Sequence, residues 1–348
     1  MGFLPFSLVW RYNPGKLTRE GEIYLLESDF AHSGLRVTAL AGGVGGARLA
    51  QGLAALLPAE QLSIIVNTGD DFEHLGLAIC PDLDTVTYTL AGLSNPTVGW
   101  GLVDESFHCL EALEKLGGPT WFKLGDRDLA THLMRTHLLH SGMSLTQATR
   151  QIAATLGVRH AILPMSDQPV HTRVITDQGE MDFQEYFVYR QWQPRLNGLR
   201  WEGIEDAQPA PEALAALQQA DLVVFCPSNP FVSIDPILLL PGVREALKKR
   251  PVVAVSPILG GNAVKGPAAK MFHELGIRPS AVAVAEHYRD LLTGFVLDEI
   301  DTDLRSEVEA LGMAACAIPS LMPVLAERIA VARGVLAFAA RFVGRTSA

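Results

Sequence analysis

Short apolar runs alternate with stretches of helical spacing along much of this chain. The apolar runs are Leu35–Ala41, Leu62–Val66, Leu222–Phe225 and Val252–Val255, and the helical stretches near them are Ala47–Leu57, Pro211–Gln219 and Val243–Lys249. Strands that are apolar throughout are typical of parallel sheets whose two faces are both covered by helices. The pattern therefore predicts an α/β fold with a doubly wound, mostly parallel, Rossmann-like sheet.

The middle of the chain departs from this alternation. Two segments have helical spacing, Asp126–His140 and Ser144–Leu156, and two more predict a hairpin, Val170–Thr176 and Met181–Tyr189. Ser144 is a suitable N-cap for the second helix. The proline- and glycine-containing stretch Pro194–Pro211 predicts a loop. We therefore expect residues from about 120 to 205 to form a helical and hairpin insertion in the sheet domain.

Residues 1–34 precede the first strong strand pattern. Within the stretch from Met1 to Trp10 no basic residue precedes the apolar run, and no small-residue cleavage site follows it. Both features disfavour a signal peptide. We expect residues 1–34 to be an N-terminal extension, either disordered or produced by an upstream start codon, outside one domain over residues 35–348. No segment offers the roughly 18 uninterrupted apolar residues of a membrane-spanning helix.

Composition and charge narrow the classes of function. The chain of 348 residues has 48% hydrophobic residues, enough for a large core, so global disorder is excluded. Its 28 Lys and Arg against 38 Asp and Glu give a net charge of −10, which argues against a nucleic-acid partner. The four cysteines have no CxxC spacing, and we interpret them as buried thiols of a cytoplasmic protein.

Polar and glycine-rich turns follow each of the four predicted strands. These turns are Gly42–Arg48, Asn67–Asp71, Pro227–Pro230 and Ser256–Gly261. In a parallel sheet they meet at the carboxyl edge, where open α/β folds bind their ligands. Each turn alone is also ordinary turn chemistry, so the prediction of a ligand site rests on their convergence.

The first of these turns contains four glycines in five positions, including Gly43, Gly45 and Gly46. Glycine allows close backbone approach, and the helix that follows offers free N–H groups to a phosphate or diphosphate. A plain tight turn is the alternative. The turn is not a dinucleotide fingerprint, because Arg48 stands at the third glycine position, and it lacks the Gly-Lys-Ser/Thr of a Walker A loop.

Four aspartates lie close together after the second strand. Asp70 and Asp71 are followed by Asp82 and Asp84, near the predicted phosphate turn. Carboxylates beside phosphate oxygens are suited to Mg²⁺, and Asp70 and Asp84 are the favoured ligands. Helix capping and solvated turns are the alternative roles.

Other polar and aromatic residues are weaker candidates. Asp126 begins a helix and could cap it, while Arg127 could bind an anionic substrate or form an ion pair. Trp100, between two glycines, could stack on a planar ring or belong to the core. Lys265 is a candidate phosphate contact or a solvated lysine.

The histidines and the possible nucleophiles give weaker evidence of a functional site than the residues above. His132, His137 and His140 show no i, i+4 pairing with a carboxylate that would indicate a metal site, so we do not expect them to bind one. No GxSxG elbow, Ser-His-Asp arrangement or Cys-His pair stands out, which disfavours covalent catalysis.

Eight sequence blocks, taken in order, resemble the 2-phospho-L-lactate transferase and phosphoenolpyruvate transferase family of coenzyme F420 biosynthesis. The blocks are Thr38–Arg48 (TALAGGVGGAR), Asn67–Asp71 (NTGDD), Cys80–Thr85 (CPDLDT), Gly99–Gly101 (GWG), Leu124–His132 (LGDRDLATH), Leu163–Asp167 (LPMSD), Pro227–Pro230 (PSNP) and Ser256–Pro267. The resemblance runs from about residue 36 to the C-terminus, and residues 1–34 fall outside it.

The resemblance implies an enzyme that takes a guanosine diphosphate activated with lactate or enolpyruvate. The phospho-acid unit would pass to a ribityl hydroxyl of the deazaflavin Fo, with release of GMP and formation of F420-0 or dehydro-F420-0. It also implies Mg²⁺ as cofactor, a homodimer in the cytoplasm, and direct in-line attack on phosphorus. The sequence leaves lactate, enolpyruvate and glycerate open as the three-carbon acid.

The same resemblance assigns expected roles to residues. Asp84, Arg127, Trp100 and Asp126 are expected at the deazaflavin; Gly43, Gly45, Gly46, Ser228, Asn229, Gly260, Gly261 and Lys265 at the nucleotide and phosphates; and Asp70 and Asp84 at the metal. Asp84 is also the candidate acceptor of the hydroxyl proton. On this interpretation Asp84→Ala would abolish turnover and leave the fold intact.

Two alternatives stay open at this point. A nucleotide-sugar-binding regulatory protein of the same fold would bind without turnover, but the Gly-Asp-Arg-Asp block and Gly99–Gly101 favour the transferase. A nicotinamide dehydrogenase rests only on the glycine turn and on Asp70 after the second strand.

Overall fold

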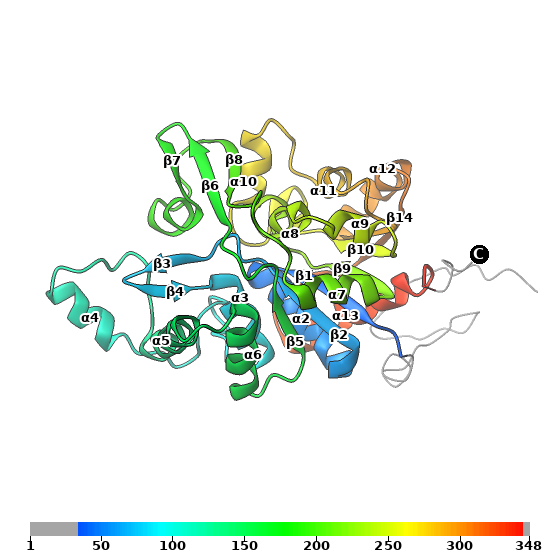
Figure 1. Ribbon diagram of the computed structural model, residues 1–348. Helices are drawn as coiled ribbons and strands as arrows, with labels where there is room; N and C mark the ends of the chain where they lie inside the picture. Colours follow the sequence, from blue (N-terminus) through cyan, green and yellow to red (C-terminus); the bar gives the residue numbers. More distant parts are fainter. Residues whose placement is uncertain (1–33, 344–348) are drawn as a thin grey trace, which may run out of the picture.

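A seven-stranded parallel sheet forms the centre of the computed structural model, which describes residues 34–343 (Figure 1). In sheet order the strands are β14 (Ala314–Ile318), β13 (Gly294–Asp298), β10 (Val252–Val255), β9 (Leu222–Phe225), β1 (Val37–Ala41), β2 (Leu62–Val66) and β5 (Ala161–Pro164). Every neighbouring pair is parallel. The predicted α/β class and parallel sheet are confirmed, and the residues expected as an N-terminal extension lie almost wholly outside the described part.

The strand order reverses between β1 and β9. From β1 the chain adds β2 and then β5 on one side, and it later returns to place β9, β10, β13 and β14 on the other side. In doubly wound sheets such a switch point opens a crevice at the carboxyl ends of the strands. The glycine turn after β1 and the Pro227–Pro230 turn after β9 meet at this point.

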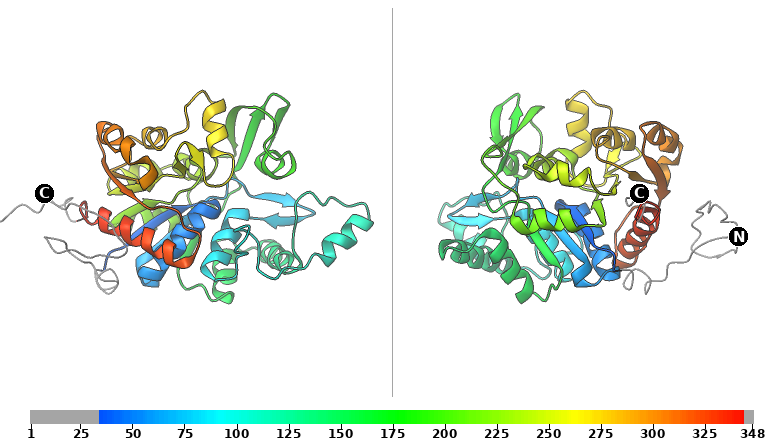
Figure 2. Two further views of the ribbon diagram at one scale, coloured as in Figure 1. Left: turned by 180° about the vertical axis from the view of Figure 1, so that it is seen from behind. Right: turned by 45° about the vertical axis from the view of Figure 1, so that its right-hand side comes forward.

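Two helical layers cover the sheet. On one face lie α2 (Gly43–Leu56), α3 (Pro81–Leu90) and α13 (Leu325–Ala339), which pack on Ala39, Ile64 and Val224. The opposite face carries α7 (Pro211–Gln219), α8 (Asp235–Leu239), α9 (Val243–Leu247), α10 (Ala268–Glu274), α11 (Ala281–His287) and α12 (Arg305–Ala310). The left-hand view of Figure 2, from behind, shows α13 lying along α2 on the near side of the sheet.

Alternating residues of each strand supply the two cores. Leu40 and Ile65 belong to the core on the face covered by α7 to α12. Their neighbours Ala39 and Ile64 belong to the core on the face covered by α2, α3 and α13. This alternation explains why the strands are apolar throughout. Gly52 allows α2 to approach α13, because a Cβ there would lie 2.1 Å from the backbone oxygen of Arg328.

An arm of hairpin and helices connects β2 to β5. It contains the hairpin β3 (Phe72–His74) and β4 (Leu77–Ile79), and the helices α4 (His108–Lys115), α5 (Asp126–His140) and α6 (Leu145–Thr155), besides α3. Figure 1 shows α4 at the outer end of this arm. Ser144 caps α6, and with Gln147 it forms a capping box, as the sequence predicted for the N-cap.

A small antiparallel sheet follows β5, in the order β7 (Gly179–Asp182), β6 (His171–Thr176) and β8 (Leu196–Glu202). Two expectations for this region were wrong. The second hairpin strand ends at Asp182, and a π-helix, η2 (Glu185–Tyr189), follows it. The expected loop Pro194–Pro211 contains β8, which forms because it can pair with β6. The segment expected as one insertion, about 120–205, also contains β5, an edge strand of the main sheet.

Short elements complete the described chain. They are η1 (Ala59–Gln61), η3 (Pro230–Ile234), β11 (Ile258–Leu259), β12 (Asn262–Ala263) and η4 (Glu299–Leu304). Within residues 34–343, no helix is both long and apolar enough to cross a membrane. Cys80 and Cys226 are buried as expected, but Cys109 is exposed at the start of α4, so the prediction of buried thiols was wrong there.

Candidate active site

The turns after β1 and β9 are tied together by one serine. Ser228 Oγ accepts a hydrogen bond from Gly42 N (3.0 Å) and donates one to Gly42 O (2.9 Å). Glycine is required by this approach, because a Cβ on Gly45 would lie 2.2 Å from Pro227 O and one on Gly46 2.6 Å from Ser228 Oγ. The turn thus exposes the N-terminal backbone of α2 at the switch point, an arrangement that suits an anion.

Asp82 joins the ends of β1 and β2. Its carboxylate accepts hydrogen bonds from Gly43 N (2.8 Å) and from Asn67 Nδ2 (3.0 Å), and Asn67 Oδ1 in turn accepts one from Gly69 N (2.9 Å). Burial raises the pKa of Asp82 to about 6, although these hydrogen bonds lower it. Asp82 belongs to the predicted aspartate group but is not among the predicted site residues.

The raised pKa of Asp82 gives a pH-dependent contribution to stability. Between about pH 4 and pH 6 the unfolded chain ionises this carboxyl while the folded protein keeps it protonated, so stability falls as pH rises. The loss is about 2–3 kcal/mol. We expect the stability advantage of wild type over Asp82→Asn to shrink by that amount between pH 4 and pH 6.5 in metal-free buffer. Chemical denaturation at both pH values measures it, and an unchanged difference would contradict the assignment.

Two further carboxylates lie beside Asp82 at the end of β2. Asp70 Oδ1 and Asp71 Oδ1 are buried and have no hydrogen-bond partner. Burial raises the pKa of Asp70 well above its usual range, and the charges of Asp82 and Asp71 raise it further. The pKa of Asp71 is also raised, chiefly by burial. The charges of Asp71 and Asp82 therefore both act against ionisation of Asp70, while Arg135 partly offsets the effect at Asp71.

These oxygens fit a hard cation. The hydroxyl oxygen of Thr68 is also buried without a partner, that of Thr172 faces Asp70, and a cavity of about 10 Å³ is lined by Asp70, Asp71 and Thr172. Carboxylate and hydroxyl oxygens are ligands of Mg²⁺ rather than of soft metals. The sequence-predicted Asp70 therefore lies where a metal would relieve the repulsion.

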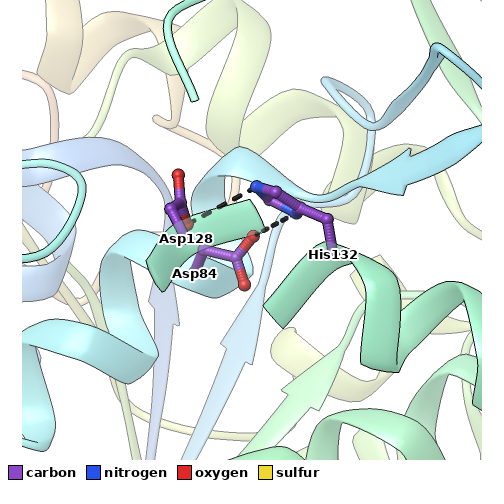
Figure 3. A group of neighbouring side chains, drawn as sticks. All are labelled: Asp84, Asp128 and His132. Carbon is purple, nitrogen blue, oxygen red and sulfur yellow. Dashed lines mark ion pairs between the residues drawn. The ribbon is translucent and has the colours of Figure 1, made fainter. Parts of the chain in front are cut away.

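Asp84 lies in a different environment. Both of its oxygens accept hydrogen bonds from the guanidinium of Arg135, one of them at 3.1 Å from Nη1. His132 Nδ1 lies 3.6 Å from Asp84, and His132 Nε2 lies 3.4 Å from Asp128 (Figure 3). The structure thus gives Asp84 and Asp70 different surroundings, because Arg135 engages both oxygens of Asp84.

The Asp128–His132 contact overturns one expectation. The sequence analysis found no carboxylate at i, i+4 to a histidine of this helix, but Asp128 and His132 form that pair. Asp84, Asp128 and His132 bring three potential ligand atoms within 4.8 Å of one another. A metal there would have to displace the guanidinium of Arg135, so we do not assign one to this group.

Trp100 and Lys265 lie together beside the glycine turn. Lys265 Nζ is 5.7 Å from the centroid of the Trp100 ring, and it donates a hydrogen bond to Val98 O. A Cβ on Gly99 would touch both Val44 of α2 and Lys265 Nζ, so this loop packs on the first turn of α2. Trp100 is 55% exposed, which excludes a role in the core.

Asp126 and Arg127 are engaged at the base of α4. The carboxylate of Asp126 accepts hydrogen bonds from His108 N (3.0 Å), Cys109 N (2.9 Å) and Ser106 Oγ (2.6 Å), and these bonds lower its pKa. Asp126 therefore caps α4 rather than its own helix. Arg127 donates to Val103 O (2.8 Å) and is exposed.

The remaining nucleotide candidates are turn and cap residues. Gly260 and Gly261 have φ of +56° and +79°, as required in the two-residue turn between β11 and β12, and Gly260 N donates to Asp301. The side chain of Asn229 caps η3 through Phe231 N (3.0 Å). Local structure alone accounts for these three residues, whereas Ser228 joins the turn after β9 to the turn after β1.

Comparison with known proteins decides the family. Residues 37–314 match the family described as 2-phospho-L-lactate transferase CofD. The chain belongs to this family. Membership makes it a transferase of a phosphate-containing group and confirms the resemblance seen in the eight sequence blocks. The nicotinamide dehydrogenase alternative loses its support.

Relatives within the family carry two names. A phosphoenolpyruvate transferase from Streptomyces griseus is 44% identical over 88% of this chain and 98% of its own length. A 2-phospho-L-lactate transferase from Methanosarcina acetivorans is 42% identical over 81% of this chain and 92% of its own length. A crystal structure of a UPF0052 family member from Bacillus halodurans aligns with a TM-score of 0.58 at 17% identity, covering 87% of this chain and 99% of that one. That likeness supports the fold alone.

A further cation, Arg48, lies near the glycine turn and is not among the predicted site residues. Arg48, on α2 after the glycine turn, lowers the pKa of Lys265 and of Arg328, in each case after burial as the larger cause. Within residues 34–343 no carboxylate forms an ion pair with Arg48 or Lys265. The signal was available, because Arg48 closes the glycine block, where it was used only to exclude a dinucleotide fingerprint.

Proposed function

We propose that this transferase moves a phospho-acid unit from a guanosine diphosphate-activated three-carbon acid to a ribityl hydroxyl of the deazaflavin Fo. The products are GMP and F420-0 or its dehydro form. The observation that carries the proposal is the 44% identity to a phosphoenolpyruvate transferase over 98% of that relative. The acid is lactate, enolpyruvate or glycerate, and relatives named for the first two match this chain almost equally.

Mg²⁺ is the proposed cofactor, with Asp70 as its main ligand. The buried unpartnered oxygens of Asp70 and Asp71 and the raised pKa values of both support this site. A bound Mg²⁺ would neutralise the charge that develops on the phosphate oxygens during transfer. Asp84 is a weaker metal candidate than the sequence suggested, because Arg135 engages it.

The donor is proposed to lie along the switch point. The N-terminal backbone of α2, between Gly43 and Gly46, would meet its diphosphate, with Lys265 and Arg48 supplying positive charge. Trp100 stands on this side, so we propose that it contacts the donor or the edge of the acceptor. Ser228, Asn229, Gly260 and Gly261 would line the guanosine side.

The proposed chemistry needs no protein nucleophile. The ribityl oxygen attacks the phosphorus that carries the acid, the bond from that phosphorus to the bridging oxygen breaks, and GMP leaves with that oxygen. The hydroxyl proton passes to water as the new phosphodiester forms. We propose that Asp84, held by the guanidinium of Arg135, orients the acceptor hydroxyl, with Arg127 at the rim of the acceptor site.

Incubation of the full chain with Fo, each activated guanosine diphosphate and Mg²⁺ tests the function. We expect GMP release that depends on Fo and stops with a chelator. The alternative, a nucleotide-sugar-binding regulator, predicts tight binding of a nucleotide sugar and no GMP. That result would overturn the proposal.

We also propose a cytoplasmic homodimer. Sedimentation of the purified chain measures its oligomeric state.

A further inference from the structure

A buried chain of polar contacts runs from Tyr88 through α5 to Asp84. Tyr88 OH donates to Asp128 Oδ1 (2.7 Å), His132 lies between Asp128 and Arg135, and Arg135 holds Asp84. Asp84, His132 and Arg135 are each less than 7% exposed. His132 Nε2 and Arg135 Nε have no hydrogen-bond partner, so this buried network is only partly satisfied.

The guanidinium of Arg135 determines which atoms donate and which accept in this series of contacts. A guanidinium has only donors, so in the 3.2 Å contact between Arg135 Nη1 and His132 Nδ1 the histidine nitrogen must accept. The proton of His132 then stands on Nε2, which faces Asp128 Oδ1 at 3.4 Å. The carboxylate of Asp128 therefore faces the N–H side of the ring as an ion-pair contact, without a hydrogen bond to Nε2.

Arg135 is held from several sides at once. Besides Asp84 and His132, its Nη1 reaches Ala78 O of β4 at 3.3 Å. The guanidinium therefore connects α5, α3 and the hairpin that begins directly after Asp70 and Asp71. Its position fixes the orientation of the Asp84 carboxylate, because two N–H groups meet the two oxygens.

We infer that Asp128, His132 and Arg135 are positioning residues that orient Asp84 toward the acceptor substrate. This inference rests on the proposed function, in which Asp84 contacts the acceptor hydroxyl. Asp128 acts only through His132 and Arg135, and it touches no substrate. Misplacing Asp84 weakens acceptor use and leaves donor binding unchanged, since among the described residues no hydrogen bond or ion pair joins Asp128, His132 or Arg135 to the glycine turn or to Lys265.

A double-mutant cycle between Asp128→Asn and Asp84→Asn tests the inference on the full chain. Both substitutions keep side-chain shape, and Asn at 128 still offers an oxygen to Tyr88. We expect Asp128→Asn alone to lower kcat/KM for the acceptor about tenfold, with the KM for the donor unchanged. In the Asp84→Asn background the same substitution should change kcat/KM less than about twofold, because its effect passes through Asp84.

Calorimetric titration with Fo and with GDP measures binding separately from turnover. Arg135→Lys keeps the positive charge, so it should retain more affinity for Fo than Arg135→Gln. His137→Asn, on the exposed side of the same helix, and Arg150→Gln, in an exposed pair with Glu212, are the matched controls. Three results would each overturn the inference: the two losses in kcat/KM multiply in the double variant, Asp128→Asn weakens GDP binding as much as Fo binding, or Asp128→Asn has no effect. A folded wild type without turnover would instead overturn the proposed function, and the Fo titrations would still test the contacts.

Discussion

Asp70→Asn should lower turnover by about 10²–10³-fold while leaving the metal-free protein as stable as wild type or more stable. The carboxylate is buried, one of its oxygens has no partner, and Asp71 and Asp82 repel it. A neutral amide removes that repulsion from the apoprotein. The same change removes the charge that would attract a cation, so activity and stability should move in opposite directions.

Metal titration and denaturation measure the two effects separately. Wild type should gain stability when Mg²⁺ is added, because a ligand that binds only the folded state stabilises it, and Asp70→Asn should gain much less. Asp290→Asn, in an exposed pair with Arg244, is the control and should behave as wild type. A variant that retains both activity and the Mg²⁺ response would remove Asp70 from the metal site.

Asp84→Ala should be both inactive and less stable, by about 3–5 kcal/mol in the free energy of unfolding. Removal of the carboxylate leaves the guanidinium of Arg135 buried without its charge partner. Asp84→Asn keeps oxygen and shape, so it should cost less. Urea denaturation compares the two variants with Asp290→Ala, whose exposed ion pair should contribute below about 1 kcal/mol. Wild-type stability in Asp84→Ala would contradict the buried pairing.

This second prediction differs from what the sequence alone supported. Sequence analysis expected Asp84→Ala to leave the fold intact, because an aspartate after a strand looks like a ligand to substrate or metal. Arg135 lies 51 residues away on another helix, and nothing in the local pattern indicates that they meet. Asp126 shows the same limit, since its carboxylate caps a helix that precedes it in the chain.

Strands were predictable where burial on both faces left a clear signal. β1, β2, β9 and β10 lie in the middle of the sheet and are continuous apolar runs. β14, at the edge, reads Ala-Ala-Cys-Ala-Ile, which has little β propensity, and it forms through pairing with β13. β8 contains Gly198 and follows Pro194, so its strand character comes from the partner β6.

The location of the site was easier to predict than the contacts between its side chains. Parallel strands bring all their carboxyl ends to one edge, so Gly42, Asn67 and Ser228 had to converge once the sheet was right. Which carboxylate stays unpaired and which one meets an arginine depends on helix placement. Asp70 and Asp84 look equivalent in sequence, and their surroundings make them different.

Mass spectrometry of the product tests the central claim most directly. The full chain is incubated with Fo, Mg²⁺ and the lactyl, enolpyruvyl or glyceryl form of guanosine diphosphate in turn. The account predicts that at least one donor gives Fo enlarged by one phospho-acid unit, with one GMP released for each product formed. Hydrolysis of the donor to GMP without modified Fo, or no reaction with any of the three donors, would contradict it.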